Sequence, residues 1–149
     1  MVVPVIDLFA GPGGLSEGFE RYRNSGAKAF RCVLSIEKEN FAYQTLLLRA
    51  FYRKFNNLPK QYYAHLRGEL SLQKLYELFP KQHKAAANEA VKLTLAKWNR
   101  TRTDTLVRNA LRGRRNSWVL IGGPPCQAYS LVGRARRRGE GRAYSCPVE

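Results

Sequence analysis

The stretch VVPVIDLFAGPGG, residues 2–14, decides the fold class of this 149-residue chain. Its first part, VVPVIDLF (2–9), is an apolar run of the kind found in a strand buried within a parallel sheet. AGPGG (10–14) then indicates a turn, because Gly and Pro interrupt regular structure. LSEGFERYR (15–23) predicts a short amphipathic helix. The stretch therefore predicts a strand, a turn and a helix, in that order.

The same order of elements repeats directly afterwards. AFRCVLSI (29–36) predicts a second strand, and residues 37–55 predict a long helix. Strands that alternate with helices are typical of a doubly wound α/β fold with a parallel sheet. SWVLIGG (117–123) predicts a further short strand near the end of the chain.

The middle of the chain has a weaker pattern. It predicts a third strand near YYAHLRG (62–68) and a helix over 71–79 with Ser71 as its N-cap. Two further helices are expected around 83–98 and 103–112, the second ending at Gly113. Because this part is rich in Lys and Arg, we interpret about 80–116 as a helical insertion.

The composition indicates one globular domain with a strongly basic surface. Hydrophobic residues make up 44% of the chain, and 26 Lys and Arg stand against 11 Asp and Glu, for a net charge of +15. Such an excess favours a polyanionic partner, above all nucleic acid, although a protein that is merely basic remains the alternative. No run approaches the roughly 20 apolar residues of a membrane span, and no signal peptide is evident. We therefore expect a cytoplasmic protein with no membrane partner.

The three cysteines predict neither a disulfide framework nor a metal site. Their number is odd, and none forms a C-x-x-C pair. Cys32 lies in an apolar stretch and is expected to be an inert core residue. Cys126 differs, because GGPPCQAYS (122–130) places two prolines and two glycines directly before it. That pattern predicts a stiff, exposed loop that presents the Cys126 sulfur in a set direction.

The glycine-rich turn predicts a ligand site. In open α/β sheets, ligands bind at the carboxyl ends of the strands. Gly11 and Gly13 fit the dinucleotide pattern G-x-G-x-x-G, but its last position is Ser16, so an ordinary tight turn stays equally open. Glu37, at the end of the second predicted strand, is placed to accept hydrogen bonds from both hydroxyls of a ribose. The alternative is an acid that is favoured at a helix N-terminus by the helix dipole, and both roles can hold at once. The pattern favours a ligand that contains adenosine.

DLFAGPGGLSEGF (7–19) followed by GGPPCQAYS (122–130) closely resembles the cytosine-5 DNA methyltransferases. The resemblance covers about residues 3–138. It implies a Rossmann-like methyltransferase fold of class α/β, with an incomplete parallel sheet and a helical insertion at about 80–116. Residues 1–138 would form a partial catalytic domain, and 139–149 a disordered tail.

The resemblance also implies a reaction and its residues. The Cys126 thiolate would add to C6 of a flipped cytosine in double-stranded DNA, and C5 would then take a methyl group from S-adenosylmethionine. The implied cofactor-binding residues are Phe9, Gly11, Gly13, Gly14, Glu37, Glu69 and Pro124. Those implied near the DNA are Gln127, Ser130, Arg134 and Arg136, the last two within the run GRARRRGEGR (133–142). A solvated, disordered tail is the alternative for that run.

Related families fit less well. Methyltransferases of amino groups have an aromatic residue directly after Pro-Pro, where this chain has Cys126. The other lineage of RNA cytosine-5 methyltransferases has a Thr-Cys context, which is absent. A tRNA methyltransferase shares the Pro-Pro-Cys-Gln loop, so DNA is favoured over tRNA without excluding it.

The later motifs of the family do not occur in this sequence. These are a Glu-Asn-Val motif, an Arg-x-Arg motif, a target-recognition domain and a late Asn motif. Three hypotheses follow: a truncated or split restriction-modification methyltransferase, a two-chain enzyme whose partner supplies the missing motifs, or a non-catalytic remnant that binds S-adenosylmethionine or nucleic acid.

Overall fold

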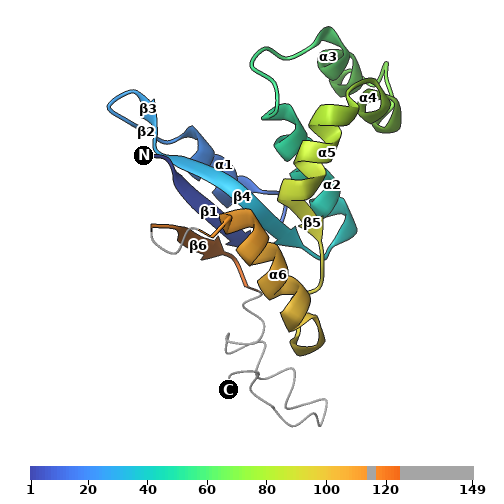
Figure 1. Cartoon of the computed structure of the whole chain (residues 1–149). Helices are drawn as coiled ribbons and strands as arrows, with labels where there is room; N and C mark the ends of the chain where they lie inside the picture. The colour runs from blue at the N-terminus through green and yellow to red at the C-terminus, as the bar shows by residue number, and fades with distance from the viewer. Residues whose placement is uncertain (114–116, 125–149) are drawn as a thin grey trace, which may run out of the picture.

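A four-stranded parallel sheet forms the centre of the computed structural model, which describes residues 1–113 and 117–124 (Figure 1). Its strand order is β5-β4-β1-β6. The strands are β1 (Val3–Leu8), β4 (Phe30–Glu37), β5 (Ala90–Lys92) and β6 (Val119–Gly122). A separate small hairpin pairs β2 (Arg23–Asn24) with β3 (Ala27–Lys28). The α/β fold class expected from the sequence is confirmed.

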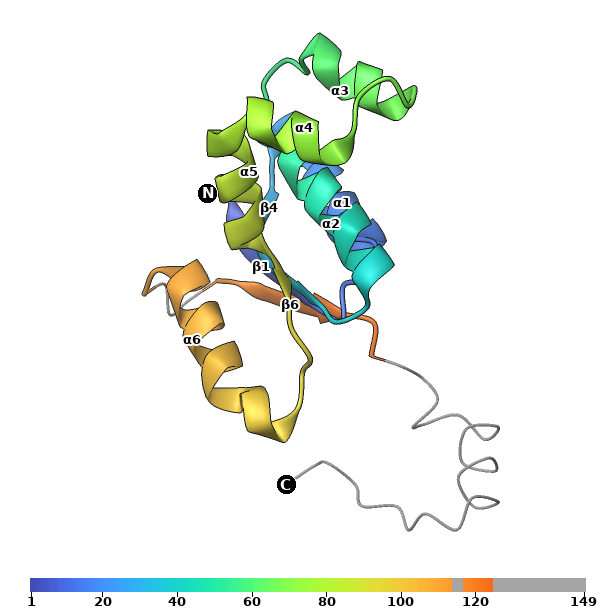
Figure 2. The ribbon, with the colours of Figure 1, turned by 90° about the vertical axis from the view of Figure 1, so that its right-hand side faces the viewer.

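Helices cover both faces of this sheet. Figure 2 shows α1 and α2 on one side and α6 on the other. Helix α5 shares the hydrophobic core of α2 and so belongs to the first side. The helices are α1 (Gly14–Arg21), α2 (Asn40–Tyr52), α3 (Lys60–Leu66), α4 (Leu72–Leu78), α5 (Pro80–Glu89) and α6 (Arg100–Leu111), with a 3-10 turn η1 (Lys97–Asn99) before α6. Helices α3 and α4 lie at the C-terminal end of α2, away from its start (Figure 2).

Each face of the sheet has its own hydrophobic core. On one face, Phe51 of α2 is fully buried and makes edge contacts with Phe55, Tyr76 and Phe79. On the other face, Leu111 of α6 packs against Ile6 and the surrounding strand residues. Burying one such side chain stabilises the fold by about 1.5–3 kcal/mol, so the two cores fix the sheet between the helix layers.

An ion-pair network joins three helices of the first face. Arg53, directly after α2, donates to Glu17 of α1 at 2.8 Å and to Glu89 of α5 at 2.5 Å. Lys54 also pairs with Glu89. Because Arg53 and Glu89 are almost fully buried, their pairing is needed to offset the cost of removing both charges from water.

The middle of the chain departs from the sequence-based prediction. Residues 62–68 do not form a strand, because α3 runs from Lys60 to Leu66. The third parallel strand is β5, which lies inside the stretch predicted as a helix over 83–98. This strand has only three residues, AVK, directly after the alanine-rich end of α5, so no alternating pattern marks it.

Other predictions for the middle are confirmed. The Ser71 hydroxyl accepts a hydrogen bond from the Lys74 amide and caps α4. Helix α6 ends at Leu111, with Arg112 and Gly113 both at positive φ. Since β5 lies within 80–116 and pairs with β4, this stretch is not helical throughout. The proposed domain boundaries stay predictions, and the expected tail at 139–149 lies outside the described residues.

Candidate functional site

The topology places the candidate site at the carboxyl ends of β1 and β6. From β1 the chain builds outward to β4 and then β5, and it crosses back to place β6 on the other side of β1. In parallel sheets of this kind, ligands bind where the strand order reverses. The glycine turn follows β1 at this point, and Pro124 follows β6.

The glycine turn has a backbone that ordinary residues resist. Gly11 and Gly13 have φ values of 57° and 84°, and Phe9 also has a positive φ, 58°. A Cβ atom on Gly13 would lie 2.7 Å from Cδ1 of Leu46. The Ala10 amide donates to the Ile36 carbonyl at 3.0 Å, which ties the turn to the neighbouring strand β4. The turn is therefore held in one shape by both its glycines and its contacts.

Glu37 connects the end of β4 to this turn. Its Oε2 accepts a hydrogen bond from the Gly11 amide at 2.8 Å. Its Oε1 accepts from the Lys38 and Glu39 amides at 2.8 Å and 2.7 Å. A carboxylate has about four acceptor positions, so three are occupied here. A ligand that used both carboxylate oxygens would have to displace or share one of these amide bonds.

Asp7 is a residue of the site that the sequence analysis did not single out. It is fully buried in β1, and neither carboxylate oxygen has a hydrogen-bond partner among the described residues. Burial raises the pKa of Asp7 above 3.8, and the polar groups of nearby Ser16 lower it by less. The signal was present in the sequence, because a charged residue inside an apolar strand is unusual.

Ser16 explains the departure from the dinucleotide pattern. It occupies the position of the third glycine, is fully buried, and its hydroxyl donates to the Gly13 carbonyl at 3.2 Å. The third glycine of such a pattern allows a helix to pack closely on a strand. Serine is small enough for the same position, so α1 still approaches the sheet here.

Most of the predicted cofactor residues are brought together. Phe9, Gly11 and Gly13 form the turn, and Gly14 begins α1. Glu37 hydrogen-bonds the turn from β4, and Pro124 is exposed just beyond β6.

Strands β1 and β6 approach each other very closely at this edge. Leu8 of β1 is aligned with Gly122 of β6, and a Cβ atom at Gly122 would lie 2.0 Å from the Leu8 carbonyl oxygen. Only glycine permits this approach, which brings Phe9 of the turn and Gly123 side by side.

Glu69 is not part of this group. Its choice rested on a third strand at 62–68, and that premise is wrong, because Glu69 follows helix α3 and lies before α4. Its carboxylate pairs on the surface with Arg67 at 2.6 Å. The third strand instead ends at Lys92, whose Nζ donates to the Asn40 side chain at 2.7 Å.

The predicted nucleophile and DNA-facing residues lie outside the described residues. These are Cys126, Gln127, Ser130, Arg134 and Arg136.

Cys32, by contrast, is described and buried. Burial raises the pKa of its thiol to about 12, which confirms the prediction of an inert core cysteine. Among residues 1–113 and 117–124, no helix is long and apolar enough to cross a membrane, and no group of three or more His, Cys, Asp or Glu side chains is arranged to hold a metal ion.

Comparison with known proteins gives two informative relatives. No protein-family model and no solved structure matches the chain. It is 35% identical over 152 residues to the type II methyltransferase M.Bpa9945I of Bacillus paralicheniformis, covering 90% of this chain and 33% of that protein. It is 27% identical over 137 residues to a protein of Oceanobacillus iheyensis named "Putative type II methyltransferase M.OihORF3336P", covering 92% of this chain and 21% of the relative.

The chain thus spans about a third or less of the length of the curated relatives that it matches. It combines a parallel α/β sheet, a glycine turn at the point of strand reversal and, over nine tenths of its length, clear sequence similarity to proteins named type II methyltransferases.

Proposed function

We propose that this chain carries the cofactor-binding and nucleophile-bearing part of a DNA cytosine-5 methyltransferase of a restriction-modification system. The observation that carries the proposal is the hydrogen bond between Gly11 and Glu37 at the reversal point of the sheet, with β6 alongside. The similarity to type II methyltransferases supports it.

The residues present fit S-adenosylmethionine. A Cβ atom at Gly11 or Gly14 would meet nothing within 4 Å, so the backbone of the turn is open to a ligand. Glu37 would hold the ribose, and exposed Phe9 would lie against the cofactor. The buried carboxylate of Asp7, which has no partner among the described residues, offers a further acceptor beneath the turn. When bound, S-adenosylmethionine supplies a methyl group on a positively charged sulfur.

Chain connectivity limits how far the proposed nucleophile can lie from this edge. Cys126 follows Pro124 by two residues, a separation that spans at most about 7 Å of extended chain. In the proposed reaction, the Cys126 thiolate forms a bond to C6 of cytosine, and the electron pair of the C5–C6 double bond moves to C5. C5 would then take a methyl group whose bond to the sulfonium sulfur breaks, with the electron pair staying on that sulfur. Loss of the C5 proton to a base would reform the C5–C6 double bond and expel the Cys126 thiolate.

DNA is the proposed substrate because the two motifs resemble those of the cytosine-5 DNA methyltransferases, and the charge of the chain fits such a polyanion. The net charge of +15 favours a polyanion, and the base must leave the duplex at a cost of a few kcal/mol, which phosphate contacts from Arg134 and Arg136 would help to offset. A tRNA substrate remains the second candidate, and the only observation that favours it is the Pro-Pro-Cys-Gln sequence shared with a tRNA methyltransferase.

Trapping of a covalent complex tests this proposal. The full chain is mixed with S-adenosylmethionine and duplex DNA containing 5-fluorocytosine, which blocks the final release of the thiol. We expect an adduct that survives denaturing electrophoresis, disappears in Cys126→Ala, and persists in the control Cys146→Ala.

Cofactor affinity is measured separately by calorimetry. Binding without an adduct would support the alternative of a non-catalytic module that binds S-adenosylmethionine. Absence of both binding and adduct would overturn the proposal, and an adduct with fluorinated tRNA alone would reassign the substrate.

A further inference from the structure

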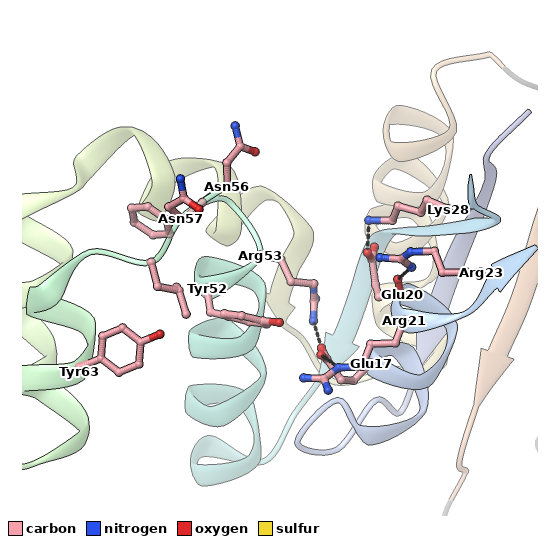
Figure 3. Close-up of a pocket in the computed structure, with 12 residues that line it drawn as sticks. Glu17, Glu20, Arg21, Arg23, Lys28, Tyr52, Arg53, Asn56, Asn57 and Tyr63 are labelled. Carbon is pink, nitrogen blue, oxygen red and sulfur yellow. Dashed lines mark hydrogen bonds and ion pairs between the residues drawn. The ribbon is translucent and has the colours of Figure 1, made fainter. Parts of the chain in front are cut away.

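A polar pocket lies at the other end of α2 from the glycine turn. Its volume is about 520 Å³, within the range of small-molecule sites, and its walls come from α1, the β2–β3 hairpin, the end of α2 and the start of α3 (Figure 3). The lining residues are Glu17, Glu20, Arg21, Arg23, Lys28, Tyr52, Arg53, Phe55, Asn56, Asn57, Leu58 and Tyr63. The proposed methyl transfer does not use this pocket.

The wall formed by α1 and the hairpin has an excess of positive charge. Three cationic side chains of this wall, Arg21, Arg23 and Lys28, line the pocket against the two carboxylates of Glu17 and Glu20, which already have partners. Glu17 accepts from Arg21 and Arg53, and Glu20 pairs with Lys28 (Figure 3). Glu20 also accepts from the Cys32 amide. Arg23 donates to the backbone carbonyls of Glu20 and Tyr22. Each guanidinium and ammonium group has more N–H groups than these contacts use, so further donors are left for an anionic ligand.

Arg53, which follows α2, makes this pocket a built site rather than a chance gathering of surface charges. Its side chain is only 10% exposed and is fixed by Glu17 and Glu89 on two other helices. Its Nε has no hydrogen-bond partner among the described residues. A buried donor left unpaired costs about 1–3 kcal/mol, so a ligand oxygen that reached it would recover that cost.

The opposite wall has a different chemistry. Tyr63 of α3 is 47% exposed, and Phe55 and Leu58 add apolar surface beside it. Asn56 and Asn57 contribute amide groups that both donate and accept. A flat aromatic ring with hydrogen-bonding edges suits such a wall, because it can stack on Tyr63 while the amides bind its edge.

We propose that this pocket binds a nucleotide, with its phosphate on Arg21, Arg23 and Lys28 and its base between Tyr63 and the two asparagines. The nucleotide is either a free nucleoside monophosphate or one unit of a single-stranded nucleic acid, since both present the same phosphate and base. This inference does not depend on the proposed methyltransferase function.

Binding to the full chain is measured by calorimetry and by NMR with three probes: uridine monophosphate, inorganic phosphate and an octamer of thymidylate. These probes lack adenosine and cytosine, and so avoid the residues proposed for the cofactor and for the target base. We expect the side-chain amides of Asn56 and Asn57 to shift, and uridine monophosphate to bind at least about fivefold more tightly than inorganic phosphate. Tighter binding of free uridine monophosphate than of the octamer would identify a free nucleoside monophosphate as the ligand. Tighter binding of the octamer would identify a single-stranded nucleic acid.

Arg21→Gln and its matched control Arg67→Gln separate a local contact from overall charge. Arg21 is 72% exposed and pairs with Glu17, and Arg67 is 59% exposed and pairs with Glu69. Arg21→Gln is expected to weaken the nucleotide at least about fivefold, and Arg67→Gln by less than twofold. Tyr63→Leu is expected to weaken the nucleotide but leave inorganic phosphate unchanged.

Three results would overturn the proposal. They are equal effects of the two arginine variants, equal affinity for phosphate and nucleotide with no effect of Tyr63→Leu, or NMR shifts confined to the glycine turn.

Discussion

At the scale of the residue, Asp7 and Glu37 are two carboxylates of the candidate site that differ in burial and in hydrogen bonding. Glu37 accepts three backbone hydrogen bonds, whereas Asp7 has no partner among the described residues and no exposure. A buried carboxylate without partners is costly when ionised, so its presence in β1 indicates a role other than stability.

Asp7→Asn is expected to change the pH dependence of stability. Because burial raises the pKa of Asp7 in the folded state, its stabilising contribution is fully present below about pH 3.8 and is lost as the pH rises through the folded-state pKa. Asparagine cannot ionise, so the variant does not lose this stability as the pH rises. At neutral pH it should be more stable than the wild type by about 1 kcal/mol, and at pH 3 it should show no gain.

Urea unfolding at pH 3, 5 and 7 measures this difference, and cofactor calorimetry on the same samples shows whether stability was gained at the expense of binding. A difference from wild type that stays constant across the three pH values would contradict the ionisation of Asp7 as its cause.

At the scale of the element, the close approach of β1 and β6 depends on Gly122. Gly122→Ala would place a Cβ atom 2.0 Å from the Leu8 carbonyl oxygen, so the two strands must separate. We expect a loss of about 2–4 kcal/mol in the free energy of unfolding, measured by urea denaturation. The control is Gly18→Ala in α1, where a Cβ atom meets nothing within 4 Å and helix propensity favours alanine by about 1 kcal/mol. Equal destabilisation by both variants would show that the β1–β6 contact is not the cause.

The elements that sequence analysis predicted well are those whose burial leaves a clear pattern. Strands β1 and β4 are long and apolar, and the glycine turn and Glu37 follow them directly, so this edge of the site could be predicted. Strand β5 could not, because three residues carry too little periodicity and their pairing with β4 is decided by tertiary contacts. The error at Glu69 followed from that missing strand, and the Arg53 network joins residues 36 positions apart, which no local pattern reveals.

At the scale of the whole molecule, strand β6 forms one edge of the sheet and has exposed apolar residues. Within residues 1–113 and 117–124, β6 pairs with β1 alone, and Leu120 on β6 and Trp118 just before it are exposed. An exposed apolar edge strand favours pairing with another chain.

Leu120→Lys is therefore expected to reduce self-association of the isolated chain at least about threefold, because a charged edge strand resists pairing. Light scattering across a concentration series measures this, with Leu66→Lys on exposed α3 as the control. If the two variants behaved alike, general surface hydrophobicity would explain the association instead.

The charge of the whole chain gives a second expectation at this scale. With a net charge of +15, affinity for duplex DNA should fall at least about tenfold between 50 and 200 mM salt, because bound phosphates release counterions. Fluorescence anisotropy with a labelled duplex measures the slope, and a slope near zero would exclude phosphate contacts as the main source of affinity.

The Arg53 network has a consequence for how the polypeptide responds to cutting. Its partners Glu17 and Glu89 lie on opposite sides, in sequence, of helices α3 and α4. A protease nick between those two helices would leave both pieces joined by the buried guanidinium and by the β4–β5 ladder. The two pieces should then elute together in gel filtration and separate only in denaturant, so the link between α3 and α4 is a place where the backbone tolerates interruption.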